Sequence, residues 1–138
     1  MIEQYIKQRH ENSVESLQTE QETRKRNEKK AYGNMEPLME VLNIPYQLCG
    51  PFGCAGETQG FRISIETGWG NTIVETYSNR KGWQVDPPRG AYYTIKGETN
   101  TCSPQWCARI EDAQWAIANS FHPHYLDRVM KDPDYFAK

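Results

Sequence analysis

The chain has 138 residues, of which 37% are hydrophobic, 12% aromatic and 25% charged, and its formal net charge at pH 7 is −2. This length supports one domain with a hydrophobic core of its own, and the aromatic content excludes a disordered chain. The net charge argues against a protein whose whole surface binds nucleic acid. The N-terminal segment MIEQYIKQRHENS has no apolar stretch, so we expect no signal peptide, no membrane span and a cytoplasmic location.

Residues 1–32 predict a long, charged helix. Glu, Gln, Lys and Arg dominate this segment, and neither Gly nor Pro occurs before Gly33, which gives a high helix propensity throughout. Apolar residues at helical spacing are few, namely Ile2, Ile6, Val14 and Leu17. Because the positions that would continue their stripe are polar, we expect no sustained coiled coil. The first half of the helix should pack on another surface, and the second half should be solvated.

The same region predicts where this helix ends. Gly33 suits a C-terminal cap, and Asn34 suits the N-terminal cap of a short second helix. This second helix has a broad apolar face and should end at Pro45. We therefore interpret residues 1–33 as a charged helical extension and residues 34–138 as an α+β core, together forming a single domain over residues 1–138.

Apolar and polar residues alternate between residues 61 and 96, which is the pattern of half-buried strands. A Gly-rich, irregular connector at 48–60 precedes this region. Turn-forming Gly, Asn and Pro residues separate the alternating segments, which are Phe61–Thr67, Thr72–Tyr77, Trp83–Val85 and Ala91–Lys96. Consecutive strands joined by tight turns predict an antiparallel meander of about four strands.

A helical period returns after Cys102. Ser103 suits an N-terminal cap and Pro104 the first helical position, although Arg109 offers a later start. The apolar face of this helix holds Trp106, Ile110, Ala113 and Ile117. A last short helix is predicted over residues 122–131. The expected fold is α+β, with the C-terminal helix or helices packed on one face of the sheet.

All four cysteines belong to two C-x-P-x-x-C loops, CGPFGC at 49–54 and CSPQWC at 102–107. Four thiolates are the ligand set of a structural zinc site, although C-x₄-C is at the long edge of the usual spacing. The alternatives are free thiols and small disulfide loops, and disulfides fit a cytosolic protein less well. The zinc hypothesis predicts that one metal ion is bound by Cys49, Cys54, Cys102 and Cys107.

A basic run, RKRNEKK, lies at 24–30 on the predicted long helix. Runs of this kind neutralise phosphates in nucleic-acid-binding proteins. The other interpretation is a solvated helix end, where cations interact favourably with the helix dipole. If the run contacts nucleic acid, the residues involved are Arg24, Lys25, Arg26, Lys29 and Lys30.

Trp, Tyr and Arg residues gather between residues 69 and 93, in the predicted turns and strands. These three residue types are enriched at the energetic centres of protein interfaces. We expect a binding surface that contains Trp69, Arg80, Trp83, Arg89 and Tyr92. The alternative is that Trp83 belongs to the core and that the arginines are ordinary turn residues.

The sequence contains no G-x-S-x-G, H-E-x-x-H, P-loop or G-x-G-x-x-G motif. It therefore favours a small non-enzymatic protein-binding module over an enzyme. Its size and composition are also typical of phage or mobile-element accessory proteins, some of which inhibit a host defence factor by direct contact. We expect a protein partner, or a second copy bound through the N-terminal helix. The alternative function is a zinc-stabilised nucleic-acid-binding domain.

Overall fold

The computed structural model describes residues 1–95 and 98–137, and it leaves the side chains of residues 92–95, 99, 100 and 137 outside the description. The fold is α+β, as the sequence predicts. A long N-terminal helix precedes an antiparallel sheet, and two short helices follow it. In the described chain, no helix combines the length and the apolar character that crossing a membrane requires.

The N-terminal helix α1, Ile2–Leu42, is a single helix and not two. The predicted break at Gly33 and Asn34 is therefore wrong, and the helix ends at Asn43, which has a left-handed φ of 54°. Pro37 lies inside the helix and cannot donate a hydrogen bond to the carbonyl of Gly33, four residues earlier. Tertiary packing on both sides of this position outweighs the lost bond and the low helix propensity of the two residues.

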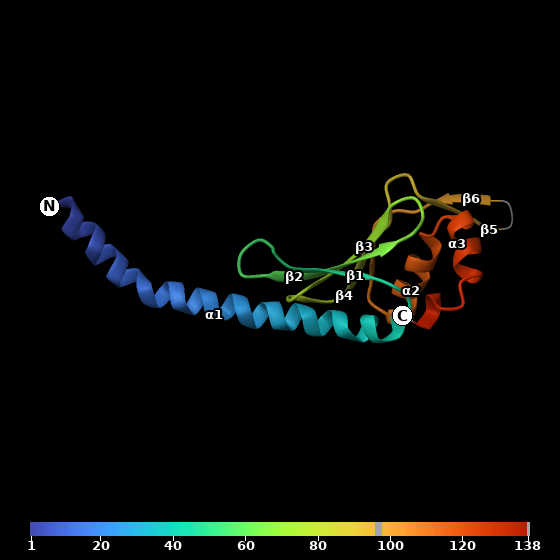
Figure 1. Cartoon of the computed structure of the whole chain (residues 1–138). Helices are drawn as coiled ribbons and strands as arrows, with labels where there is room; N and C mark the ends of the chain where they lie inside the picture. Colours follow the sequence, from blue (N-terminus) through green and yellow to red (C-terminus); the bar gives the residue numbers. More distant parts are fainter. Residues whose placement is uncertain (96–97, 138) are drawn as a thin grey trace.

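The two halves of α1 differ in their surroundings. The start of the helix, which the sequence predicts to pack on another surface, is largely exposed, whereas residues 17–30 are largely exposed as predicted. The second half packs on the sheet and buries a stripe at helical spacing, which consists of Ala31, Met35, Leu38 and Leu42. The amide of Asn27 donates to the carbonyl of Glu57 at 2.9 Å, close to where this packed half begins. The first half is largely exposed and projects beyond the sheet (Figure 1). The second half packs on the sheet because it carries this apolar stripe, which the sheet can bury.

The sheet has five antiparallel strands in the order β1-β2-β3-β4-β7. Its strands are β1 (Gln47–Gly53), β2 (Gln59–Glu66), β3 (Asn71–Tyr77), β4 (Arg80–Asp86) and β7 (Gln105–Cys107). A separate hairpin of β5 (Tyr92–Ile95) and β6 (Glu98–Thr101) is inserted between β4 and β7. The predicted strand at Ala91–Lys96 corresponds to β5, except that Lys96 lies outside the described residues.

Two strands occupy segments for which the sequence predicts other structure. β1 forms within the Gly-rich connector, where Gly50 has a φ of 71° and the register shifts between Leu48 and Pro51. An edge strand tolerates such a bulge and a proline, because one of its sides needs no ladder hydrogen bonds. β7 takes the segment expected to begin a helix, so the helix α2, Ile110–Asn119, begins only after Arg109. The last helix is confirmed as α3, Pro123–Met130, and a short 3₁₀ helix η1 follows at Tyr135–Ala137.

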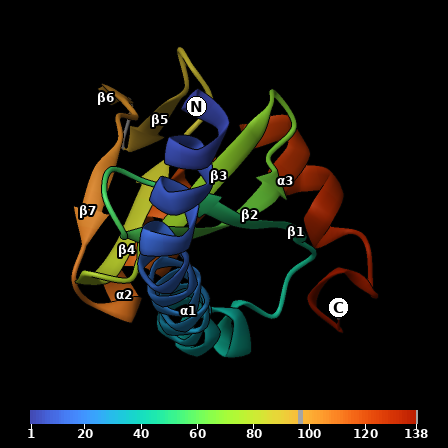
Figure 2. The ribbon, with the colours of Figure 1, turned by 90° about the vertical axis from the view of Figure 1, so that its left-hand side faces the viewer.

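One face of the sheet carries the core, and α1 and α2 lie on that side (Figure 2). The sheet contributes to this core Phe61, Ile63, Ile65, Val74, Trp83, Val85 and Cys107. α2 adds Ala113 and Ile117, and α3 closes one end through Val129. Within the described residues, no helix packs on the opposite face of the sheet.

The division of α1 into a packed half and a projecting half predicts different effects for the same substitution. Leu38→Ala should lower the free energy of unfolding by about 2–5 kcal/mol, because it leaves a cavity against the sheet. Leu17→Ala, in the projecting half, should change it by less than about 0.5 kcal/mol. Urea unfolding followed by circular dichroism measures both values, and equal losses would contradict the division.

Candidate binding surface on the open sheet face

Strand alternation places a second set of side chains on the face that the helices leave uncovered. The register pairs Ile63 with Val74 on the core side, and it pairs Arg62 with Glu75 on the other side. Gln84 is the next partner of Glu75 across the sheet. We call this side of the sheet the open face.

A row of aromatic rings and guanidinium groups crosses the open face. The guanidinium carbon of Arg62 lies 4.5 Å from the ring centroid of Phe52. The Phe52 ring meets Tyr77 edge-to-face at 5.9 Å, and Tyr77 stacks on Trp106 at 6.0 Å with 22° between the planes. The guanidinium carbon of Arg80 lies 3.8 Å from the Trp106 ring centroid. We call these five residues the arginine–aromatic row, and they come from all five strands of the sheet.

Two glycines allow the rings of this row to lie close to the backbone. A Cβ atom at Gly60 would overlap the tip of the Phe52 ring. A Cβ atom at Gly82 would lie 2.8 Å from Nε1 of Trp106 and 2.7 Å from the carbonyl oxygen of Cys107, and the φ of Gly82 is +115°. A larger residue at either position would push the ring away from the sheet. The row is thus built by paired glycine and aromatic positions on neighbouring strands.

The charges of the open face are only partly neutralised by the protein itself. Arg62 makes an ion pair of 3.2 Å with Glu75, whose side chain is 14% exposed. Arg80 and Arg89 make no ion pair with any of the described residues. Burial, followed by the charge of Glu75, raises the pKa of Tyr77 further above neutral pH, so its hydroxyl is not a negative charge on this face. The face therefore offers cations and hydrogen-bond donors beside apolar rings.

The open face continues into a hollow at the opposite end of β4. This hollow has a volume of about 480 Å³, and its walls include Ile73, Asp86, Pro88 and Arg89. Arg80 begins β4 and Arg89 follows its end. Two of the five residues that the sequence predicts for binding therefore belong to one surface. The open face presents a flat row at one end and a concave site at the other.

The other three predicted binding residues have different surroundings. Trp83 is 7% exposed and belongs to the core, so its ring offers almost no surface to a partner. Trp69 is partly buried, its Nε1 donates to the carbonyl of Ser120 at 2.8 Å, and its ring lies 5.0 Å from that of His122. These contacts connect the β2–β3 turn to the segment between α2 and α3. The backbone of Tyr92 begins β5, but its side chain lies outside the described residues.

Four residues of the row were missed because their strands or their faces were not recognised. Phe52 lies in the connector that the sequence predicts to be irregular, and Trp106 lies in the segment predicted to be helical. Arg62 and Tyr77 do lie in predicted strands. Their position opposite the apolar residues of those strands was the available signal, because alternating residues point to opposite faces.

The structure does not bring the four cysteines together. Cys49 is exposed, Cys54 is partly exposed at the end of β1, and Cys107 is buried on the core side of β7. All four are free thiols. Among the described residues, no group of three or more His, Cys, Asp or Glu side chains is arranged to hold a metal ion. Cys107 also lies in β7, within the segment that the sequence predicts to begin a helix after Pro104.

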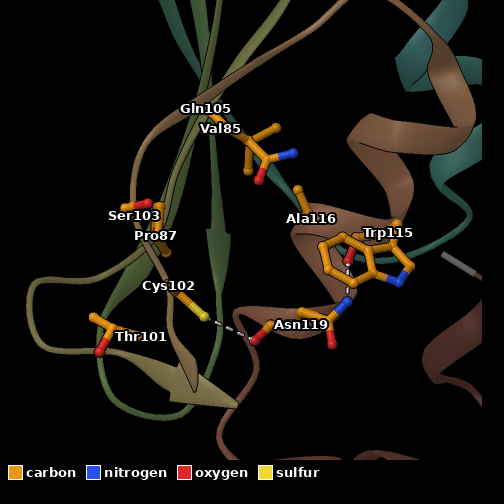
Figure 3. A pocket seen from close by; sticks show the side chains of 9 residues that line it. All are labelled: Val85, Pro87, Thr101, Cys102, Ser103, Gln105, Trp115, Ala116 and Asn119. Atoms are coloured by element: carbon orange, nitrogen blue, oxygen red, sulfur yellow. Dashed lines mark hydrogen bonds between the residues drawn. The ribbon is translucent and has the colours of Figure 1, made fainter. Parts of the chain in front are cut away.

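A second hollow, between α2 and the strands, contains one of these thiols (Figure 3). It has a volume of about 180 Å³. Within it, the Cys102 thiol donates to the carbonyl of Asn119 at 3.3 Å, and the Asn119 amide donates to the carbonyl of Trp115 at 2.8 Å. Burial raises the pKa of the Cys102 thiol, so it remains protonated and is a weak nucleophile at neutral pH. This arrangement stabilises the end of α2 and does not resemble a catalytic site.

The basic run lies on α1 and not on the open face. Its five cationic side chains, Arg24, Lys25, Arg26, Lys29 and Lys30, are all exposed. Arg24 makes a 3.6 Å ion pair with Glu20 on the same helix. Since α1 covers the core face of the sheet, these charges and the arginine–aromatic row do not form one surface.

Comparison with known protein families, curated protein sequences and solved structures finds no match for this chain.

The contact between Gly60 and Phe52 predicts a measurable coupling. Gly60→Ala should destabilise the protein by about 1–3 kcal/mol, because the added methyl group displaces the Phe52 ring. In a Phe52→Ala background the same substitution should cost much less, since the ring is no longer there. A double-mutant cycle from denaturant unfolding gives the coupling energy. Equal costs in both backgrounds would show that the ring does not lie over Gly60.

The surroundings of the cysteines predict the order of their alkylation. With iodoacetamide near neutral pH, Cys49 should react first because it is exposed, and Cys107 should react last because it is buried. Cys54 and Cys102 should react slowly, because burial raises the pKa of both thiols. Mass spectrometry of peptides after short reaction times measures the order. If added zinc protected all four thiols together, the four-cysteine metal site would be supported instead.

Proposed function

We propose that the protein is a non-enzymatic binding module whose open face binds a partner protein. The arginine–aromatic row is the observation that carries this proposal. Tyr, Trp and Arg are the residue types that dominate the binding energy of protein interfaces, and here they stand side by side on a sheet face that no described helix covers. A rigid sheet also holds such residues at low entropic cost.

The chemistry of the row favours an acidic segment of the partner. Arg80 stacks on Trp106. Neither Arg80 nor Arg89, which lines the hollow, forms an ion pair with a carboxylate of the described residues. A guanidinium group that is held in place by stacking is preorganised to bind a carboxylate through two hydrogen bonds. We therefore expect Asp or Glu side chains of the partner to meet Arg80 and Arg89, with apolar side chains against the rings of the row.

Several observations favour a protein over a nucleic acid as the partner. Bases stack on exposed aromatic faces, whereas here the ring faces of Phe52 and Trp106 are occupied by guanidinium groups. The open face also includes the carboxylates of Glu75 and Asp86, which repel phosphates. The exposed basic run lies on α1, away from this face. The zinc-stabilised alternative is less well supported, because the described residues contain no cluster that could hold a metal ion.

A protein that acts by covering the surface of its partner needs no catalytic group. This mode of action fits the class suggested by size and composition, in which a phage or mobile-element accessory protein blocks a host defence factor by direct contact. In that case the acidic segment would belong to the host factor, and binding would mask it.

The test is a selection of yeast-displayed random peptides on the immobilised full chain. Peptides rich in Asp and Glu should be enriched, and Arg80→Glu should weaken their binding at least about ten-fold, because it reverses the charge that is stacked on Trp106. Trp106→Ala should have an effect of similar size. The matched controls are Arg128→Glu and Trp115→Ala, which alter an exposed Arg on α3 and an exposed Trp on α2. Neither control should change binding.

Two outcomes would overturn the proposal. The first is a set of selected peptides that bind Arg80→Glu as well as they bind the unaltered protein. The second is tight, salt-sensitive binding of a fluorescent single-stranded oligonucleotide that the same two substitutions abolish. That result would assign the open face to nucleic acid.

A further inference from the structure

A groove on the other side of the molecule is lined almost entirely by apolar side chains. It lies where the end of α1 meets α2, α3 and η1, and its volume is about 260 Å³. Its walls include Leu42, Ile117, Phe121, Leu126, Met130 and Phe136. Of these, Leu126 is 40% exposed, Phe136 47% and Met130 71%. We call this site the C-terminal groove.

A second apolar surface lies at the opposite end of the same chain. Ile2, Tyr5 and Ile6 are 73%, 74% and 62% exposed on the projecting half of α1. Their spacing of i, i+3 and i+4 is that of the anchor residues of a helix that binds in an apolar groove. Neither surface has a covering element among the described residues. The chain thus carries both members of a helix-in-groove contact.

The two surfaces cannot meet within one chain. α1 is a continuous helix of 41 residues, which is about 60 Å long. The groove is at its C-terminal end, and the three anchor residues are at its N-terminal end (Figure 1). A second copy of the chain can supply a helix for the groove of the first copy and a groove for its helix.

The geometry of the helix fits such a second copy. When two α1 helices lie antiparallel and overlap fully, residues 2 and 6 of one come level with residues 42 and 38 of the other. Ile2 and Leu38 are separated by about ten helical turns, as are Ile6 and Leu42, so the anchors point to the side on which α1 packs on its own sheet. In a two-fold arrangement they then face the layer of the partner that contains its α2 and α3. The same anchor-to-groove contact then forms twice, once in each direction, so the assembly stops at two copies.

We propose that two copies form an antiparallel dimer in which Ile2, Tyr5 and Ile6 of each copy occupy the C-terminal groove of the other. This contact uses different residues from the open face, so the dimer would present two open faces to partners. Failure of one proposal therefore leaves the other intact.

The test is native mass spectrometry of the full chain at micromolar concentration, with variants of both surfaces. The unaltered protein should be a dimer. The double variant Ile2→Asp/Ile6→Asp and the groove variant Met130→Asp should each raise the dissociation constant at least about ten-fold, because each introduces charge into an apolar contact. All these positions are exposed in the single chain, so the variants should fold normally, and circular dichroism checks that they do.

A matched control and a mixing experiment make the test specific. Gln4→Asp/Gln8→Asp adds the same two charges to the opposite side of the same helix segment, where both side chains are exposed, and it should leave the dimer intact. An equal mixture of the helix variant and the groove variant should form a mixed dimer, since one intact contact remains between them. A monomeric unaltered protein, a dimer that survives both variants, or a mixture without mixed dimers would overturn the proposal.

Discussion

The packing of the second half of α1 on one face of the sheet is the constraint on which the rest of the structure depends. A sheet whose two faces both lacked cover would expose the apolar residues of β2, β3 and β4, including Ile63 and Val74, which are fully buried. α1 covers this face with Met35 and Leu38, and α2 extends the cover toward β7. Because the helices lie on the same side, the other side of the sheet can carry polar and aromatic residues.

The same contact links the core to the open face. Thr76 donates to the carbonyl of Ala31 on α1 at 3.0 Å, and Asn34 donates to the carbonyl of Tyr77 at 3.0 Å. These two bonds hold the end of β3 against the helix, and Tyr77 is the central ring of the arginine–aromatic row. A helix on one side of the sheet thereby fixes the position of a side chain on the other side. Such preorganisation lowers the entropic cost of binding.

The parts of the fold that were predictable are those in which local pattern and tertiary packing agree. The alternation in β2 and β3 is clear in the sequence, and α3 has both a proline in its first turn and a clear end. The errors occur where packing overrides a local signal. Gly33 and Pro37 are strong helix breakers, yet α1 continues through both because Met35 between them and Leu38 beyond them are buried against the sheet. The proline of the second cysteine loop likewise precedes a strand.

The candidate site was harder to predict than the fold, for a physical reason. A row that crosses a sheet takes its members from strands that are distant in sequence, so no short motif records it. The turn position of Arg80 indicates an exposed cation, whereas its stacking partner Trp106 lies in a segment whose helical pattern hides the strand β7. The pairing of Gly60 with Phe52 becomes visible only when the register of β1 and β2 is known. Residue type alone also predicted Trp83 as a binding residue, although its side chain is buried in the core.

The continuity of α1 has a consequence for how this chain can change during evolution. One residue inserted into the projecting half would turn everything before it by about 100° around the helix axis and advance it by only about 1.5 Å. Ile2 and Ile6 would then point to a different side, although the helix would be almost the same length. Insertions or deletions of seven or eleven residues, close to whole numbers of turns, would preserve the direction and alter the reach. The length of this segment is therefore expected to vary in steps and not gradually.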